Sequence, residues 1–328
     1  MSTSTTQHEI TATLFHRLRH PNATPASSAH LSISTVSAFL ETIKSITNTT
    51  TPIQHSHRFL DSQDAPHVLA ITFSSPAPLN TLRHHSALHT FESTHSLELV
   101  LLATSISRTP TRLAVFDMDS TLIQQEVIDV LAAHAGVEPQ VASITARAMN
   151  GELDFAASLR SRVALLKGLP ASVFEDIKPQ ITLTPGAEVL LRVLKKKGVK
   201  TALLSGGFTP LAKWVAGKLG IEYVHANFLE VDGEGRLTGQ LEQGSTIVDA
   251  EFKRRRLVEI AEEVGVKSME EVLAVGDGAN DLLMLGQAGL GVAVNAKEKV
   301  QREAQARLNG RMALLDVLFL MGMTEQGE

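Results

Sequence analysis

The chain has no cysteine, one tryptophan, one tyrosine and no long uninterrupted apolar segment. The lack of cysteine excludes disulfides, thiolate catalysis and cysteine-ligated metals, and it fits a reducing compartment, so we expect a cytoplasmic protein. No stretch of about 18 apolar residues is present to span a bilayer. The N-terminus also lacks the basic and apolar regions of a secretory signal. We therefore expect no membrane partner.

Basic residues are in the minority. The chain holds 30 Lys and Arg against 35 Asp and Glu, for a formal net charge of -5. This balance disfavours a nucleic-acid partner. A content of 43% hydrophobic and 20% charged residues is typical of a globular protein. The length of 328 residues is sufficient for two domains, or for one large domain with an insertion.

Composition changes near residue 110, because 11 of the 13 histidines precede it. Ser105–Thr111 has the composition of a linker, so we predict domains over residues 1–108 and 109–328. In the first, the pattern predicts strands and helices in β-α-β-α-β order, which is typical of a small ferredoxin-like α+β fold. Pro52–Gln63 is expected to be a polar loop. The predicted strands are Ile10–Phe15, His67–Phe73 and Leu97–Ala103, and the predicted helices are Val36–Ile46 and Leu79–Phe91.

The second domain alternates short apolar runs with helical patterns, which predicts an α/β fold with a doubly wound parallel sheet. Gln124 to Ile181 contains only helical stretches, so we expect a helical cap over residues 124–181. Asn227–Gln240 predicts a β-hairpin. The predicted strands are Leu113–Phe116, Val199–Leu204, Val272–Val275 and Leu290–Val294. The predicted helices are Ala187–Lys197, Pro210–Leu219, Ala279–Gln287 and Lys297–Leu308.

Two carboxylates, Asp117 and Asp119, follow the apolar strand Leu113–Phe116. The carboxyl ends of strands are where open α/β sheets place their ligands. Carboxylates held together are costly unless a cation neutralises them. Asp277, which follows a third apolar strand, supplies a further hard oxygen ligand of the kind that Mg²⁺ prefers. The sequence therefore predicts a magnesium-dependent phosphoryl-transfer site.

Phosphate-binding groups are also present. Ser205-Gly206-Gly207 is expected to end a strand and open a helix, which would let backbone N–H groups approach a phosphate. Lys253 would supply a compact positive charge to the same oxygens. Asp277 and Asp281 are four residues apart, with Asn280 beside them, and can share one helix face.

Each motif alone has a plainer interpretation. An isolated Asp-x-Asp is most often a solvated turn, Ser-Gly-Gly a tight turn, and Lys253 one member of a solvated basic run. The segment Gly276–Asp281 resembles a calcium loop, but its spacing does not match an EF-hand. Because all of these motifs occur in this order and at strand ends, together they favour a phosphoryl-transfer site.

Together these motifs resemble those of the haloacid dehalogenase superfamily, and within it the phosphoserine phosphatases. The resemblance covers about Leu113 to Leu320 and continues through the cap as Glu126, Met149–Phe155 and Ser158–Arg162. It implies a magnesium-dependent hydrolysis of phosphoserine to serine and phosphate, the last step of serine biosynthesis. Asp117 would form an aspartyl-phosphate, and Asp119 would act first as acid and then as base.

The resemblance also implies roles for the remaining residues. Asp117, the backbone carbonyl of Asp119, and Asp277 would hold Mg²⁺, with Asp281 in support. Ser205, Gly206 and Lys253 would bind the phosphoryl group, and Asn280 would order that end of the site. In the cap, Glu126 would meet the substrate ammonium and Arg162 its carboxylate, while Met149 and Phe155 would line the apolar side.

Other interpretations stay open at this point. A related small-molecule phosphatase or a phosphotransferase would share the same core motifs. A catalytically silent amino-acid sensor is a third hypothesis, which the complete set of carboxylates disfavours. Some relatives carry a small regulatory ACT domain at the N-terminus. Binding of serine there and assembly as a homodimer are also open.

Overall fold

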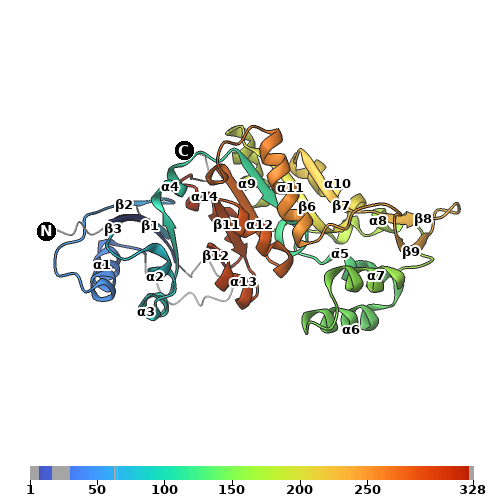
Figure 1. Ribbon diagram of the computed structural model, residues 1–328, viewed down its shortest axis with the longest axis horizontal. Coiled ribbons are helices and arrows are strands. Elements are labelled where there is room, and N and C mark those ends of the chain that lie inside the picture. Colours follow the sequence, from blue (N-terminus) through green and yellow to red (C-terminus); the bar gives the residue numbers. More distant parts are fainter. Residues whose placement is uncertain (1–6, 17–29, 63, 65, 325–328) are drawn as a thin grey trace.

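The computed structural model describes residues 7–16, 30–62, 64 and 66–324. Two β-sheets lie one after the other along the long axis of the molecule, and a group of helices lies beyond the second (Figure 1). Among the described helices, none combines the length and the apolar character needed to cross a bilayer.

The first sheet is antiparallel and contains four strands in the order β2-β3-β1-β4. With its helices it has the β-α-β-β-α-β order of a ferredoxin-like fold, which agrees with the predicted class but has one strand more than the predicted β-α-β-α-β order. Its core is built from the inward residues of the strands together with Phe39 of α1 and Phe91 of α3. The strands are β1 (His8–His16), β2 (His55–Phe59), β3 (Val68–Ser75) and β4 (Leu97–Ala103), and the helices are α1 (Ile33–Thr47), α2 (Leu79–Arg83), α3 (Ser86–His95) and α4 (Thr104–Arg108).

Three expectations for this part were wrong. The segment Ser105–Thr111, predicted as a linker, begins within helix α4. The segment predicted as a polar loop contains β2, which is an edge strand whose side chains are almost all exposed. An edge strand of this kind lacks the apolar alternation that marks a buried one. The single helix predicted over Leu79–Phe91 is two helices, α2 and α3, because the backbone leaves the helical conformation at His85.

The second sheet is parallel and has six strands in the order β12-β11-β10-β5-β6-β7, which confirms the predicted α/β class. Strand β5 is central, and alternate residues face opposite sides. Leu113 and Val115 pack with α11 (Ala250–Glu263) and α12 (Leu282–Gln287). Ala114 and Phe116 join the core that includes α9 (Ala187–Lys196) and α10 (Thr209–Leu219). The strands are β5 (Leu113–Phe116), β6 (Lys200–Phe208), β7 (Tyr223–Asn227), β10 (Val272–Gly276), β11 (Leu290–Val294) and β12 (Ala306–Leu308).

Helices cover both faces of this sheet, with the hairpin β8 (Leu229–Val231) and β9 (Leu237–Leu241) inserted after β7. The predicted helix over Lys297–Leu308 was wrong in its second half, where the chain forms edge strand β12. Strand β7, at the other edge, was not predicted. The helices are α9 (Ala187–Lys196), α10 (Thr209–Leu219), α11 (Ala250–Glu263), α12 (Leu282–Gln287), α13 (Glu298–Glu303) and α14 (Ala313–Leu320).

The segment after β5 is helical, as expected, and its helices lie beyond the carboxyl ends of the strands (Figure 1). Phe155 of this group reaches the sheet at Gly206 of β6. These helices are α5 (Val127–Ala135), α6 (Glu138–Met149), α7 (Phe155–Ala164) and α8 (Val173–Asp176).

The two sheets share a hydrophobic core at their junction. Phe15 of β1 and Phe319 of α14 belong to one buried cluster, and their ring centroids lie 6.5 Å apart. Both side chains are almost fully buried. The packing of α14 against the antiparallel sheet therefore joins the two parts of the chain.

Candidate active site

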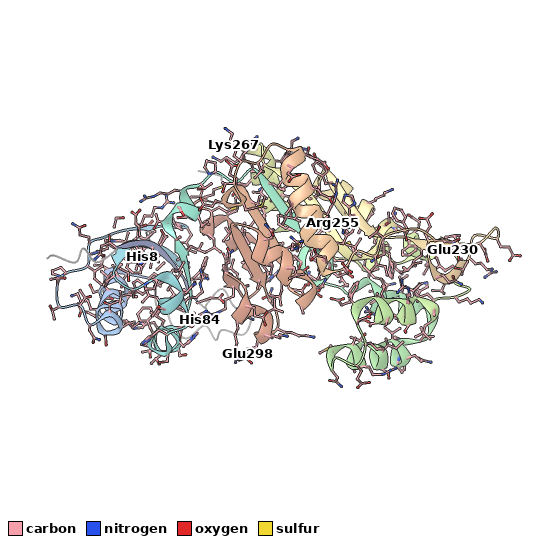
Figure 2. All side chains as sticks on the ribbon, viewed as in Figure 1. His8, His84, Glu230, Arg255, Lys267 and Glu298 are labelled. Atoms are coloured by element: carbon pink, nitrogen blue, oxygen red, sulfur yellow. The ribbon has the colours of Figure 1, made fainter. Side chains whose placement is uncertain are left out.

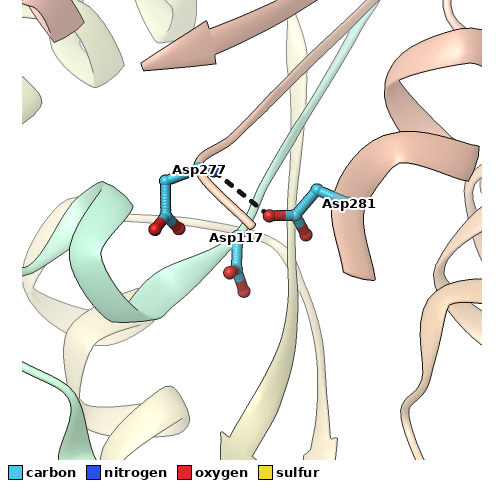
Figure 3. A group of neighbouring side chains, drawn as sticks. All are labelled: Asp117, Asp277 and Asp281. Atoms are coloured by element: carbon cyan, nitrogen blue, oxygen red, sulfur yellow. Dashed lines mark hydrogen bonds between the residues drawn. The ribbon is translucent and has the colours of Figure 1, made fainter. Parts of the chain in front are cut away.

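Three aspartates meet at the carboxyl ends of the central strands β5 and β10 (Figure 3). Asp117 directly follows β5, and its backbone N–H donates to the carbonyl of Val275 in β10 at 3.0 Å. Asp277 directly follows β10, and Asp281 lies one turn further on. One carboxylate oxygen from each of the three lies within 4.8 Å of the others. The parallel pairing of β5 and β10 thus brings together residues far apart in the sequence.

Lys253 connects two of these aspartates. Its Nζ lies 2.7 Å from Oδ1 of Asp117 and 2.7 Å from Oδ1 of Asp281, and its side chain is completely buried. It reaches the site from the first turn of α11, whose N-cap is Asp249. A lysine with no exposed surface needs such partners, because an unpaired buried ammonium is very costly.

Burial dominates the electrostatics of the carboxylates. Desolvation, with repulsion from Asp281, raises the pKa of Asp117 to about 7 despite the pull of Lys253. Desolvation and repulsion from Asp117 and Asp281 raise the pKa of Asp277 to about 8. Burial lowers the pKa of Lys253, but its two carboxylate partners outweigh this and hold that pKa above its usual range. When ionised, the three carboxylates therefore carry more negative charge than Lys253 neutralises.

Asp119 lies on the tight turn Met118–Leu122, which leads the chain out of β5. Ser120 in this turn adopts a left-handed φ of 54°. One oxygen of Asp119, Oδ2, accepts from the backbone N–H of Val127 at 3.1 Å. The other, Oδ1, is buried and has no hydrogen-bond partner among the described residues. Burial, followed by repulsion from Glu126, holds the pKa of Asp119 well above its usual range, so this carboxyl group is suited to hold a proton and release it.

Asp277 and Asp281 are held by the loop after β10. The hydroxyl of Thr121 donates to Oδ1 of Asp277 at 3.2 Å. Oδ2 of Asp281 accepts from the backbone N–H groups of Asp277 and Gly278, at 3.1 and 2.9 Å. Asn280 folds back over Gly278, where its Oδ1 would lie 2.2 Å from a Cβ, so a larger residue there would displace the Asn280 side chain.

This donor set fits a hard divalent cation. All three groups are carboxylates, the ligand type that Mg²⁺ and similar ions bind in proteins. The excess negative charge of the cluster and the raised pKa values of Asp117 and Asp277 are the expected signs of a site that a cation would stabilise.

The segment Ser205–Gly207 departs from expectation. The predicted strand ended at Leu204, but β6 continues through this segment to Phe208. Helix α10 begins at Thr209, within one residue of the predicted start, and the phosphate-binding role of the segment stays a prediction. Ser205 is fully buried, and its hydroxyl accepts from the N–H of Gly207 at 2.9 Å. A Cβ on Gly207 would lie 3.3 Å from Oδ2 of Asp119, so this backbone borders the carboxylates.

Sequence reasoning missed Asn227, which fixes this segment. Its Nδ2 donates to the carbonyl of Gly206 at 2.8 Å, and its Oδ1 accepts from the N–H of Val248 at 2.9 Å. The side chain is 2% exposed. The only available signal was an asparagine at the end of a strand that was not itself predicted.

The cap contributes Phe155 and Arg162, one on each end of α7. The ring of Phe155 lies against Gly206, at 2.9 Å from the position a Cβ would occupy. Arg162 is half-buried. Burial lowers its pKa, while the nearby carboxylates of Glu126, Asp129 and Asp119 act in the opposite direction. Glu126, at the N-cap of α5, accepts from the hydroxyl of Ser120 at 2.6 Å. Arg162, Glu126 and Asp119 are thus neighbours.

Met149 lies apart from this group. It is the last residue of α6 and is 63% exposed. Its sulfur lies 3.4 Å from Nζ of Lys297, which follows β11 at the same edge of the parallel sheet. This contact joins the far end of the cap to the sheet.

The family of the chain can now be stated. Residues 111–289 match the model of the haloacid dehalogenase-like hydrolases. The match spans both aspartate loops, Lys253 and the helices beyond β5. The chain belongs to this hydrolase family and is an enzyme of that class.

Individual relatives narrow the comparison. The chain is 46% identical over 241 residues to a probable phosphoserine phosphatase of Schizosaccharomyces pombe, covering 73% of this chain and 80% of that one. It is 43% identical over 235 residues to the phosphoserine phosphatase of Saccharomyces cerevisiae, covering 71% and 75%. A probable phosphoserine phosphatase structure from Vibrio cholerae aligns with a TM-score of 0.68 at 31% identity, covering 96% and 86%.

Proposed function

We propose that the protein hydrolyses O-phospho-L-serine to L-serine and phosphate, and so completes serine biosynthesis. The observation that carries the proposal is the placement of Arg162 and Glu126 beside Asp119, next to the buried cluster of Asp117, Lys253 and Asp277. The buried cluster suits the phosphate ester. Arg162 and Glu126 suit the carboxylate and the ammonium group of a free amino acid. The curated names of the relatives agree with this substrate.

Asp117 is the proposed nucleophile. Its carboxylate oxygen attacks phosphorus, an aspartyl-phosphate forms, and the bond from phosphorus to the seryl oxygen breaks. Asp119 gives its proton to that departing oxygen and then takes a proton from the water that attacks the aspartyl-phosphate. The raised pKa of Asp119 favours the protonated form that the first step needs. The products are serine, phosphate and the original Asp117.

Asp117, Asp277 and the backbone carbonyl of Asp119 are the groups that would hold Mg²⁺, with Asp281 in support. The cation would reduce the repulsion between the attacking carboxylate and the negatively charged phosphate. Lys253, Ser205 and the backbone N–H of Gly206 would bind the phosphoryl oxygens, and Asn280 would order the loop beside them. When the substrate binds, Lys253 would give up part of its ion pair with Asp117 and bind the phosphoryl oxygens instead.

The cap would select the amino acid. Arg162 would bind the substrate carboxylate with its planar fork, and Glu126 would bind the ammonium group. Phe155, which already lies against Gly206, and Met149 would line the apolar side of the substrate. Met149 would have to leave its exposed position near Lys297 to do so, which implies movement of the cap.

The remaining proposals concern the chain as a whole. We assign residues 1–108 and 109–328 to two domains, with the cap over 124–181, and we expect a cytoplasmic protein. The N-terminal domain is proposed to bind serine, and a homodimer is the proposed assembly. Non-competitive inhibition of the full chain by added L-serine would support serine binding outside the active site, whereas purely competitive inhibition would contradict it.

The first test is phosphate release from phospho-L-serine by the full chain, with Mg²⁺ and with a chelator, beside a panel of small phosphate esters. We expect preference for phosphoserine, loss of turnover without metal, and loss of turnover in Asp117→Asn. Metal-dependent turnover of other esters but not of phosphoserine would refute the proposed substrate and leave the chemistry intact. A phosphotransferase would form new esters when alcohols are added, and a silent sensor would release no phosphate. The comparisons favour neither alternative.

A further inference from the structure

A cavity lies at the junction of the two sheets, away from the aspartate cluster. Strand β4 is one edge of the antiparallel sheet, and β12 is one edge of the parallel sheet. The cavity has a volume of about 460 Å³ and is lined by α2, α3 and β4 on one side and by α13 and β12 on the other. His84 and Glu298, which line it from opposite sides, are labelled in Figure 2. A volume of this size suits a small organic ligand.

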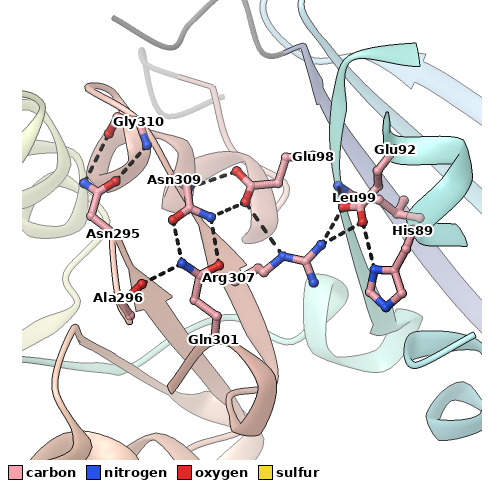
Figure 4. Close-up of polar contacts among 10 residues, drawn as sticks. All are labelled: His89, Glu92, Glu98, Leu99, Asn295, Ala296, Gln301, Arg307, Asn309 and Gly310. Carbon is pink, nitrogen blue, oxygen red and sulfur yellow. Dashed lines mark hydrogen bonds and ion pairs between the residues drawn. The ribbon is translucent and has the colours of Figure 1, made fainter. Parts of the chain in front are cut away.

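Most of the charges that line this cavity are already paired. Arg307 of β12 donates from Nη2 to both carboxylate oxygens of Glu92 in α3, at 2.6 and 2.8 Å (Figure 4). Glu92 also accepts from the backbone N–H of Leu99 at 2.8 Å. Arg302 pairs with Glu298 one turn earlier on α13. These two arginines therefore have carboxylate partners.

The amide side chains of the lining are also occupied. Gln301 donates to the carbonyl of Ala296 at 2.6 Å and to Asn309 at 2.9 Å. Gln305 donates to the carbonyl of Ala288 at 2.9 Å and accepts from the N–H of Gly291 at 3.2 Å. These groups shape the wall and are not available as the main binding contacts.

Arg83 differs from the other lining residues. Its Nη2 donates to the carbonyl of Leu101 at 3.0 Å, which fixes the guanidinium at the end of α2. Its Nε is buried and has no hydrogen-bond partner among the described residues. Within the part of the chain that the structure describes, no carboxylate pairs with it. Burial lowers the pKa of Arg83, and no neighbouring anion opposes this effect. A partly desolvated guanidinium without a counter-charge is unfavourable.

We propose that this cavity is a second, non-catalytic ligand site, which binds a small organic monocarboxylate through the guanidinium of Arg83. Arg83 lacks a carboxylate partner among the described residues, whereas the neighbouring Arg302 and Arg307 have theirs, so the single charge of a monocarboxylate suits it better than a phosphate dianion. The planar fork of arginine matches a carboxylate group. His84 and His89, at the same wall, would meet the rest of the ligand.

The position of the cavity means that a bound ligand would connect the two sheets. It would touch α2 and α3 of the antiparallel sheet and α13 of the parallel sheet at once. Glu98 of β4 already accepts from the side chain of Asn309 across this junction, at 2.6 Å. A ligand in this cavity would add contacts between the antiparallel and the parallel sheet. Its binding should therefore raise the melting temperature of the full chain.

The test is isothermal titration of the full chain with acetate, pyruvate, lactate, isovalerate and 4-methyl-2-oxopentanoate, with inorganic phosphate as the comparison anion. We expect at least one monocarboxylate to bind saturably, and to bind about tenfold more weakly to Arg83→Gln. Arg302→Gln, which removes a paired arginine from the same lining, should leave binding unchanged. Asp117→Asn should also leave it unchanged, so failure of the proposed phosphatase activity does not affect the result.

Several outcomes would overturn the proposal. It is refuted if no acid in the series binds, if Arg83→Gln binds as the unaltered chain does, or if phosphate alone binds at this cavity. If Arg83→Gln does not fold, the unaltered chain is treated with phenylglyoxal, an arginine reagent, and the modified peptides are mapped. Protection of Arg83 by the bound acid supports the site, and equal modification with and without the acid refutes it.

Discussion

Nζ of Lys253 lies 2.7 Å from Oδ1 of Asp117, and both side chains are buried. The same ammonium also pairs with Asp281. Removing the lysine leaves two buried carboxylates without a counter-charge. Such a loss typically costs about 3–5 kcal/mol, far more than breaking a surface ion pair. The lysine therefore supports the folded state as well as the proposed phosphate binding.

We expect Lys253→Met to lower the free energy of unfolding at pH 8 by about 3–5 kcal/mol. Urea unfolding measures this change. Arg255→Met, on the exposed side of the same helix with a surface partner in Glu259, should change stability by less than about 1 kcal/mol. Equal effects of the two substitutions would contradict the buried pairing.

The carboxylates give the metal-free chain a specific pH dependence. Asp117 and Asp277 have pKa values of about 7 and 8 in the folded chain, against a usual value of 3.8. Between these values the folded state holds more protons than the unfolded state. Stability therefore falls as pH rises from the unfolded pKa through the folded pKa values. A divalent cation competes with the same protons, so it should bind more tightly at pH 8 than at pH 6.

Thermal unfolding in a chelator between pH 5.5 and 8.5, repeated with Mg²⁺, measures both effects. Asp277→Asn removes one titrating group, so this variant should show a flatter pH profile without metal and a smaller gain with metal. A metal-free chain that becomes more stable over this range, with Asp277→Asn unchanged in slope, would refute the assignment.

The buried strands could be predicted from sequence, and the edge strands could not. Leu290–Val294 is a continuous apolar run, and the prediction matched β11. β12, with only Ala306–Leu308, has too few residues to show a period, and its neighbour α13 suggested a longer helix. β2 is exposed along its length, so its sequence resembles a loop. Edge strands are specified by their neighbours, which a linear pattern does not contain.

The proposed site residues divide in a similar way. Asp117 and Asp277 follow buried strands, and this position brings them together. Lys253 could be chosen among four adjacent basic residues only through the family motif, because helix geometry alone does not mark which one points inward. The hydrogen bonds of Asn227 and Thr121 depend on loops that meet only in three dimensions, so no sequence pattern indicated them.

Arg162 offers a test of substrate choice. We expect Arg162→Ala to raise KM for phosphoserine by at least about tenfold, because a charge-assisted pair with the substrate carboxylate is lost. The KM of a generic ester such as p-nitrophenyl phosphate should change little, since it has no such carboxylate. Arg160→Ala, an exposed arginine on the same helix, is the matched control. Equal losses on both substrates would argue against this role for Arg162.

Asn227 offers a test of positioning. Its amide holds the carbonyl of Gly206 on one side and the N–H of Val248 on the other, so it ties the backbone proposed to bind phosphate to the segment before α11. In Asn227→Ala, both partners lose a buried bond, which typically costs about 1–3 kcal/mol of stability. The misplaced Gly206 should also lower kcat for phosphoserine and for p-nitrophenyl phosphate alike, because both substrates present the same phosphoryl group. A variant that loses stability but keeps the kcat of both substrates would show that Asn227 supports the fold alone. A loss of kcat with phosphoserine alone would instead indicate that Asn227 acts through the cap residues proposed to bind the amino acid.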